Sequence, residues 1–329
     1  MRPFSTAPTG DPMTDDTRDA RRRFLKGAGL AVAGGLLPGL AGSAEATRSG
    51  PAQGAPADAP ASSEQAKLDR LASNTYPMRA LFKRRNERSD GRGAQAADAM
   101  KQKYGEITLL DFPQFTRDRF PGVRRMDLWS SLFGDVTDAS MFIETKVTRG
   151  ERTRSVFEFD PVSAAGRKWL DQLAARMAKT GVTCHHVSNN APRDISELDE
   201  SARRQGIDTA KKWLDACAVL RAKTMRVNTG GPRIAPSATA TTGYPRNDEI
   251  VKYFTNAIES FKEMADHGGK VGVKVTIENH WGLSADPMNI RIILDEVNHP
   301  FCEASPDFCN WEHEYMLYHG LKALAPYAH

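Results

Sequence analysis

The chain has 329 residues, with 45 Lys and Arg against 41 Asp and Glu, 40% hydrophobic residues and 26% charged residues. This composition excludes a wholly disordered chain, and the length fits one large domain or two small ones. A formal net charge of +4 gives no reason to expect a nucleic-acid or membrane-surface partner, and four cysteines exclude a disulfide-rich scaffold. After the N-terminal region no run of about 18 apolar residues predicts a membrane span.

The first 46 residues carry the features of an export signal. Arg21-Arg22-Arg23-Phe24-Leu25-Lys26 precedes an apolar run with five Gly and one Pro, and the small-x-small pattern Ala44-Glu45-Ala46 follows. The pattern resembles a twin-arginine signal peptide, which implies the twin-arginine translocase as a partner during export and a periplasmic or extracellular protein. We predict cleavage after Ala46 and no stable membrane insertion afterwards; a buried N-terminal helix and a retained anchor are the alternatives.

The next segment, residues 47–66, is rich in Ala, Pro, Gly and Ser. It has too few apolar side chains to offset the entropy lost on ordering, so we predict a disordered linker. The remaining residues, 67–329, match the length of a (β/α)8 barrel, which is typically about 250 residues.

Short apolar runs alternate with helical patterns from residue 71 onward, which predicts a parallel sheet with helical crossovers. The predicted strands are Leu71–Tyr76, Arg125–Ser130, Val182–Val187, Thr224–Asn228, Val271–Glu278 and Phe301–Asp307. The predicted helices are Ala165–Thr180, Asp208–Ala222, Asp248–His267, Pro287–Val297 and Glu312–Ala325. Between the second and third strands, Met141–Val147 and Thr153–Phe159 predict an antiparallel hairpin, either a lid over the barrel mouth or an external decoration.

Two carboxylates end neighbouring predicted strands. Because side chains alternate along a strand, Val273, Val275 and Ile277 face the helices while Glu278 points inward at the carboxyl end. The same alternation places Asp307 inward on the next strand. Two carboxylates at matching heights repel unless a proton or a divalent cation lies between them, so the pair suggests a metal site. The alternatives are an ion pair between Glu278 and Arg226, and a helix N-cap role for Asp307.

The strand-end sequences Ile277-Glu278-Asn279 and Ser305-Pro306-Asp307, with 109–115 and 127–131, resemble the xylose-isomerase-like TIM-barrel superfamily of sugar phosphate isomerases and epimerases. The resemblance implies a barrel from about residue 71 to 329. In that family, a Glu, an Asp, a His and a second Glu on successive strands bind one divalent metal. Glu278 and Asp307 match the first two, and His329, on a seventh strand expected to begin at Ala325, is the candidate third. The fourth has no counterpart, so we expect a C-terminally truncated barrel that lacks the last strand or two and has six parallel strands with an open seam.

By this resemblance the chain is an exported, metal-dependent sugar isomerase or epimerase with one divalent metal, Mn²⁺, Mg²⁺ or Zn²⁺. A proton would move through a metal-stabilised enediolate, with Glu278 as ligand and base. Asn310 stands where many of the epimerases have a His, which favours a non-catalytic sugar-binding or inactive truncated barrel as the alternative. A metal-dependent phosphoesterase of the AP-endonuclease type is a third reading, weakened by the few strand-end His residues and the near-neutral mature charge.

Further polar and aromatic residues near strand ends are candidates for binding a carbohydrate substrate. They are His186, Asn228, His280, Trp281 and Trp129. Aromatic faces suit the C–H surfaces of sugars, although core or rim packing is the alternative for both Trp residues. For His186 the alternative is a hydrogen-bonded structural histidine, and for Asn228 it is holding a loop.

Overall fold

The computed structural model describes residues 63–85, 92–149, 152–232, 247–311 and 314–328. The predicted signal segment lies outside these ranges, as does most of the predicted linker. The first described element, helix α2 (Glu64–Leu68), begins inside the last residues of that linker, where the Ser63 hydroxyl accepts the Ala66 backbone N–H. The first described helix therefore begins a few residues before the predicted domain boundary at residue 67.

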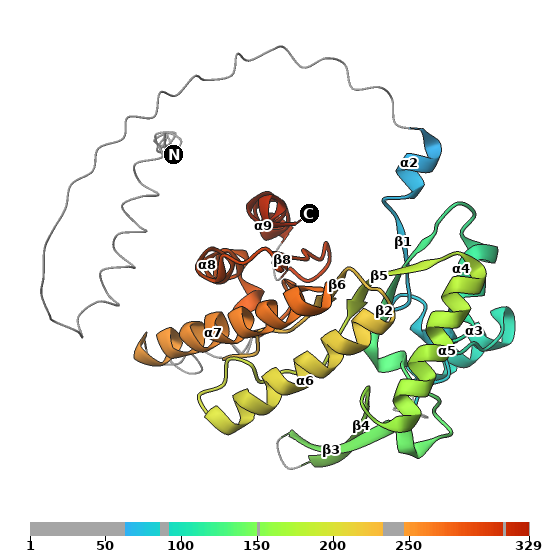
Figure 1. Ribbon diagram of the computed structural model, residues 1–329, viewed down its shortest axis with the longest axis horizontal. Coiled ribbons are helices and arrows are strands. Elements are labelled where there is room, and N and C mark those ends of the chain that lie inside the picture. Colours follow the sequence, from blue (N-terminus) through green and yellow to red (C-terminus); the bar gives the residue numbers. More distant parts are fainter. Residues whose placement is uncertain (1–62, 86–91, 150–151, 233–246, 312–313, 329) are drawn as a thin grey trace, which may run out of the picture. The chain divides into compact units, whose positions relative to one another are not determined.

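Six parallel strands form the central sheet of the described chain, in the order β1-β2-β5-β6-β7-β8 (Figure 1). Their bounds are Ala72–Asn74, Arg125–Trp129, Thr183–Ser188, Thr224–Arg226, Lys274–Ile277 and Cys302–Ala304. Every pair of neighbours is parallel, and no pairing joins β1 to β8 among the described residues. The six-stranded sheet and its open edges match the sequence prediction, and β1 and β8 are its two ends.

Helices connect successive strands and cover one face of the sheet, as parallel crossovers require. They are α3 (Arg92–Tyr104), α4 (Phe112–Arg119), α5 (Ala164–Thr180), α6 (Glu200–Val219), α7 (Asn247–Val271), α8 (Pro287–Val297) and α9 (Glu314–Leu324). Short 3-10 turns occur at Arg79–Leu81, Ser130–Leu132, Ala139–Met141, Gly282–Ala285 and Ala325–Tyr327. Helices α5 to α9 pack side by side in chain order. None of the described helices combines the length and hydropathy needed to cross a membrane.

Local sequence fixes where the helices begin and end. The Ser163 hydroxyl accepts the Gly166 N–H at the start of α5, and Gly181 ends that helix at φ 68°. Helix α8 starts with Asp286 as N-cap and Pro287 in the first turn. Helix α7 continues to Val271, followed by Gly272 at φ 76°, so the predicted strand start at Val271 was wrong.

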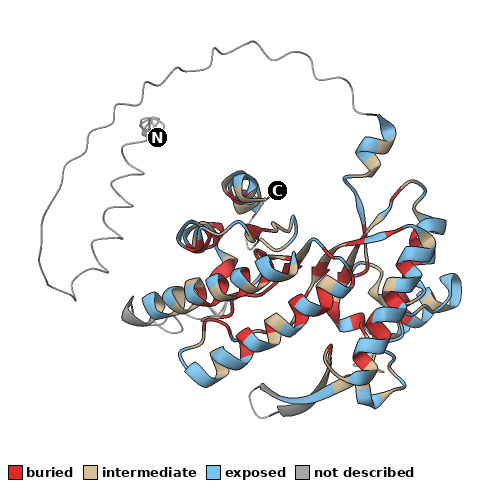
Figure 2. Cartoon of the chain, in the orientation of Figure 1, coloured by how far each residue is buried: buried red, intermediate tan, exposed pale blue. Residues whose placement is uncertain are grey.

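The core lies between the sheet and the helices, where Figure 2 shows the buried residues gathered on facing sides. Val275 and Ile277 of β7 are fully buried there, as the alternation predicted. The opposite face of the sheet carries polar side chains in rows. Thr224 and Arg226 share that face on β6, and Thr276 and Glu278 continue it on and just after β7.

The predicted hairpin is present as β3 (Phe142–Arg149) and β4 (Arg152–Phe159), paired antiparallel with Phe142 opposite Phe159. Aromatic packing fixes its base. The Phe159 ring lies 5.8 Å from Phe133, 5.4 Å from Trp169 on α5 and 5.8 Å from Trp213 on α6, measured between ring centroids. The hairpin is therefore anchored beside the segment that follows β2, at the carboxyl ends of the strands.

Candidate active site

Glu278 follows β7 directly and is 9% exposed. One carboxylate oxygen, Oε2, forms an ion pair with the Arg226 guanidinium of β6, whose side chain is 7% exposed. The other oxygen, Oε1, accepts a hydrogen bond of 3.0 Å from the Asn310 amide. The ion pair with Arg226, one of the two readings of the sequence, is therefore present.

Asp307 follows β8, and the structure brings its carboxylate beside that of Glu278. The Asn310 amide nitrogen donates to Asp307 Oδ2 at 2.9 Å as well as to Glu278 Oε1, so it bridges the two carboxylates. The backbone of Asp307 is fixed by Asn279, whose side chain donates to Asp307 O at 3.0 Å and accepts from Asp307 N at 2.7 Å. Asp307 accepts the Cys309 N–H and α9 begins only at Glu314, so the N-cap reading of Asp307 was wrong.

Arg226 is buried and is held by three partners at the ends of the strands. Besides the Glu278 pair, its Nε donates to Asn189 O at 3.1 Å and its Nη2 donates to Asn190 Oδ1 at 2.7 Å. Both Asn189 and Asn190 follow β5. The guanidinium thus joins the ends of β5, β6 and β7 and fixes the orientation of the Glu278 carboxylate.

The pKa of Glu278 is raised to about 7, chiefly by burial and also by the neighbouring Asp307 carboxyl, while Arg226 opposes the rise. A carboxyl group that is half protonated near neutral pH can both accept and donate a proton. Asp127 on β2 is a second such group: burial raises its pKa to about 6, against a lowering effect of the Ser188 hydrogen bond and of Arg226.

Asp127 was not among the residues singled out from the sequence. Its Oδ1 accepts from the Ser188 hydroxyl at 2.8 Å and its Oδ2 accepts from the Asn74 amide at 2.9 Å. It shares the inward face of β2 with Trp129, so strand alternation was the signal that could have identified it.

Four of the five predicted substrate-binding residues lie at the carboxyl ends of the strands or just after them. Asn228, just after β6, is 4% exposed, and its Oδ1 is buried and accepts no hydrogen bond from the described residues. Trp129 is half-buried at the end of β2, with its ring 5.0 Å from Tyr76 in an edge-to-face contact. His280 and Trp281 follow Glu278 at the rim, exposed and half-buried respectively.

His186 lies deeper, with its Nδ1 2.7 Å from Thr224 Oγ1. Burial lowers the pKa of this imidazole to about 3, so it is neutral, which agrees with the structural reading of this residue. The predicted third metal ligand, His329, lies outside the described residues. Residues 325–327 form a 3-10 turn, so the strand expected to begin there was wrong.

A divalent metal at this centre would bind the two carboxylates. The Asn310 nitrogen lies within 3.0 Å of an oxygen of each, so both acids already converge on one electropositive group. Oxygen donors of this kind suit Mn²⁺, Mg²⁺ or Zn²⁺, and the pair fits as a partial ligand set. Within the described part of the chain, no three His, Cys, Asp or Glu side chains gather in a metal-binding arrangement.

Comparisons with known proteins give a family and a set of distant structures. A family model described as the xylose isomerase-like TIM barrel matches residues 143–327, more than half of the chain. No curated protein matches the sequence. Solved structures also resemble the fold, and three of them follow; at these identities the similarity concerns the fold alone.

The first is 3-keto-D-glucoside 4-epimerase YcjR from E. coli, with 15% identity over 48% of this chain and 61% of that one and a TM-score of 0.42. D-psicose 3-epimerase with D-tagatose from Clostridium cellulolyticum H10 has 13% identity, coverage of 68% and 66%, and a TM-score of 0.47. A xylose isomerase-like protein from Mycobacterium smegmatis in complex with magnesium has 14% identity, coverage of 68% and 66%, and a TM-score of 0.42. This chain spans less than two thirds of each of these proteins. With its parallel strands, strand-end acids and family match, the chain belongs to the xylose isomerase-like TIM-barrel family.

Proposed function

We propose that the protein is a metal-dependent sugar isomerase or epimerase that moves a proton to and from a carbon next to a carbonyl group. The observation that carries this proposal is the meeting of Glu278 and Asp307 at the carboxyl ends of adjacent strands, where barrels of this type place their chemistry. Family membership supports the reaction class.

Glu278 is the proposed proton acceptor. In the metal-free protein burial raises its pKa to about 7, which makes this carboxylate a stronger base than an exposed glutamate. Arg226 and Asn310 each hold one of its oxygens, so the carboxylate is oriented before substrate binds. Asn228 offers a buried acceptor with no partner among the described residues, which suits a substrate hydroxyl.

Glu278 and Asp307 are the residues proposed to hold the metal. A divalent cation bound there would polarise the substrate carbonyl and make the adjacent C–H more acidic. Trp129, His280 and Trp281 are proposed rim contacts to the sugar.

The test is proton exchange rather than product formation alone. D-tagatose and D-psicose, the sugars named with the Clostridium enzyme, are incubated with the protein and Mn²⁺ or Mg²⁺ in D₂O, and loss of the C–H signal is followed by NMR. We expect exchange with the wild-type protein, loss of at least a hundredfold with Glu278→Gln, and no change with Glu296→Gln, an exposed residue on α8.

A non-catalytic sugar-binding barrel is the second candidate. The ion pair with Arg226 compensates Glu278 without a metal, and Asn310 is not a titratable group at neutral pH. Sugar binding by the wild-type protein without any exchange, across a panel of keto sugars with each metal, would establish this alternative and reject the enzyme.

We also propose that the chain is exported through the twin-arginine route. The support is the sequence Arg21-Arg22-Arg23-Phe24-Leu25 before an apolar run and a small-x-small site. Fractionation of cells that express the whole chain tests this: the Arg21→Lys, Arg22→Lys variant should stay in the cytoplasm. Equal amounts of both forms outside the cytoplasm would reject the route.

A further inference from the structure

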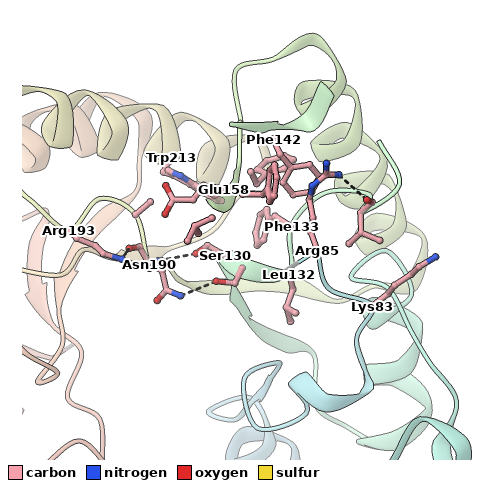
Figure 3. A pocket seen from close by; sticks show the side chains of 16 residues that line it. Lys83, Arg85, Ser130, Leu132, Phe133, Phe142, Glu158, Asn190, Arg193 and Trp213 are labelled. Carbon is pink, nitrogen blue, oxygen red and sulfur yellow. Dashed lines mark hydrogen bonds between the residues drawn. The ribbon is translucent and has the colours of Figure 1, made fainter. Parts of the chain in front are cut away.

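A cavity of about 50 Å³ lies between the hairpin β3–β4 and the loops that follow β2 and β5 (Figure 3). Ser130 and Asn190 line it from the strand ends, Glu158 and Phe142 from the hairpin, and Trp213 from α6. A cavity needs a volume of about 10–15 Å³, expressed in the same way, to hold one water molecule. The cavity therefore has room for a terminal group with one or two hydroxyls, and not for a whole sugar ring.

The walls of this cavity are fixed before any ligand binds. The Phe133 ring packs against Phe159 and Trp213. On the other side, the Arg85 guanidinium lies 4.8 Å from the centroid of the Phe142 ring and 4.7 Å from that of Phe157, and its Nη1 donates to Val136 O. Two rings and a carbonyl thus hold the Arg85 guanidinium in place, while its buried Nε has no hydrogen-bond partner among the described residues.

Glu158 supplies a free hydrogen-bond acceptor to the cavity. Its side chain is half-buried, and no described residue donates a hydrogen bond to its carboxylate. Burial raises the pKa of Glu158, with Arg193 opposing the rise. A partly buried carboxylate without donors is unfavourable unless a ligand or water supplies them, and sugar hydroxyls are such donors.

Asn190 joins this cavity to the Glu278 centre. Its Nδ2 donates to Ser131 Oγ at 3.0 Å on the cavity side, and its Oδ1 accepts from Arg226 Nη2 at 2.7 Å on the other. Its backbone N–H donates to Ser130 Oγ at 2.9 Å. One rigid residue therefore forms the boundary between the cavity and the guanidinium that orients Glu278.

We propose that this cavity is the subsite for the hydroxylated end of the sugar whose reactive carbon lies at Glu278, with Glu158 accepting hydrogen bonds from the terminal hydroxyls. This inference rests on the proposed function for the position of the reactive carbon. The hairpin is then neither an external decoration nor a lid but one wall of the substrate cleft.

The experiment measures D-tagatose binding by calorimetry in the absence of turnover, in the full-length protein. Glu158→Gln should weaken binding about tenfold, because an amide is a weaker acceptor than a carboxylate. Glu144→Gln, on the same hairpin but exposed and outside the cavity, should leave the affinity unchanged. A second pair of variants adds an aromatic ring to β4. Val156→Phe, inside the cavity, should weaken binding, and Ser155→Phe, on the exposed neighbouring residue that points to the other face of the hairpin and does not line the cavity, should not.

The outcomes separate this inference from the proposed function. Equal affinity of wild type, Glu158→Gln and Val156→Phe overturns the subsite even if proton exchange proceeds. A loss of affinity in both variants without any exchange in the wild type supports the subsite and rejects the chemistry at Glu278. Failure of wild type to bind D-tagatose, or inorganic phosphate binding that Glu158→Gln strengthens, overturns the assignment to a neutral hydroxylated group.

Discussion

Replacing Arg226 by Met tests how the Glu278 centre is stabilised. Both side chains of the pair are at most 10% exposed, so the variant leaves a carboxylate buried without its counter-charge. Removing one partner of a buried ion pair typically costs about 3–5 kcal/mol of unfolding free energy. At pH 8, where Glu278 is largely ionised in the folded wild type, we expect a loss in that range.

The loss should depend on pH. The pKa of Glu278 is raised in the folded protein from 4.5 to about 7, which by linkage favours the protonated folded form by about 3 kcal/mol. That stability is fully present below pH 4.5 and is lost as the pH rises through 7. At pH 5 Glu278 is neutral in both proteins, so Arg226→Met loses hydrogen bonds to Asn189, to Asn190 and to the uncharged Glu278 carboxyl but no ion pair, about 2–3 kcal/mol.

Urea unfolding of wild type and Arg226→Met at pH 5 and pH 8 measures both values. Arg176→Met on α5 is the control, because Arg176 is exposed and its loss should change stability by less than about 0.5 kcal/mol at either pH. A cost of Arg226→Met that is the same at both pH values would refute the reasoning, since it would mean that the ionisation of Glu278 does not determine what Arg226 contributes.

Three further predictions concern the surroundings of the site. Asp127→Asn should remove part of the pH dependence of stability. The pKa of Asp127 is raised from 3.8 to about 6 in the folded protein, so the wild type should lose about 3 kcal/mol of unfolding free energy between pH 4 and pH 7, and the variant should not. Parallel urea-unfolding profiles of the two proteins over this pH range would contradict the prediction. Asn310→Ala removes a hydrogen-bond donor to the charged form of Glu278, so the pKa of Glu278 should rise further in an NMR titration. An unchanged titration of Glu278 would mean that the Asn310 hydrogen bond has no electrostatic effect on this carboxyl. Phe159→Ala should lower the unfolding free energy by about 3–5 kcal/mol because the residue is 5% exposed and its ring packs among four others, whereas Ile143→Ala, at an exposed position, should cost less than about 0.5 kcal/mol. Equal thermal unfolding of the two variants would show that the hairpin is not anchored by this cluster.

Strand and helix order could be predicted because hydrophobic patterning is strong from α5 onward. The inward position of Glu278 followed from the alternation of Val273, Val275 and Ile277, and these three are buried against the helices. Helix α3 was missed because it is rich in Ala, Gln and Lys and has little apolar periodicity. The first two turns of α6, from Glu200, were missed for the same reason, although Asp199 provides an N-cap there.

The partners of the site residues were harder to predict, because they depend on distances across several strands. Asp127 stands in the 127–131 segment that contributed to the family resemblance, but no site role for it followed from the sequence. Its contacts with Asn74 and Ser188, on the strands to either side of β2, show that it is held from both sides. Asn190 follows a strand as an ordinary loop residue in the sequence. Its contacts to Ser131 and Arg226 exist because the ends of β2, β5 and β6 meet at one edge of the sheet.

The two readings of Glu278, ion-pair partner and metal ligand, are compatible because they use different oxygens. Arg226 pairs with Oε2, whereas Oε1 faces Asn310 and, through it, Oδ2 of Asp307. A cation that displaced the Asn310 amide would gain the two carboxylate oxygens without breaking the pair with Arg226. The guanidinium would then keep the carboxylate oriented while the second oxygen changes its partner, so the ion pair by itself is no argument against a metal at this centre.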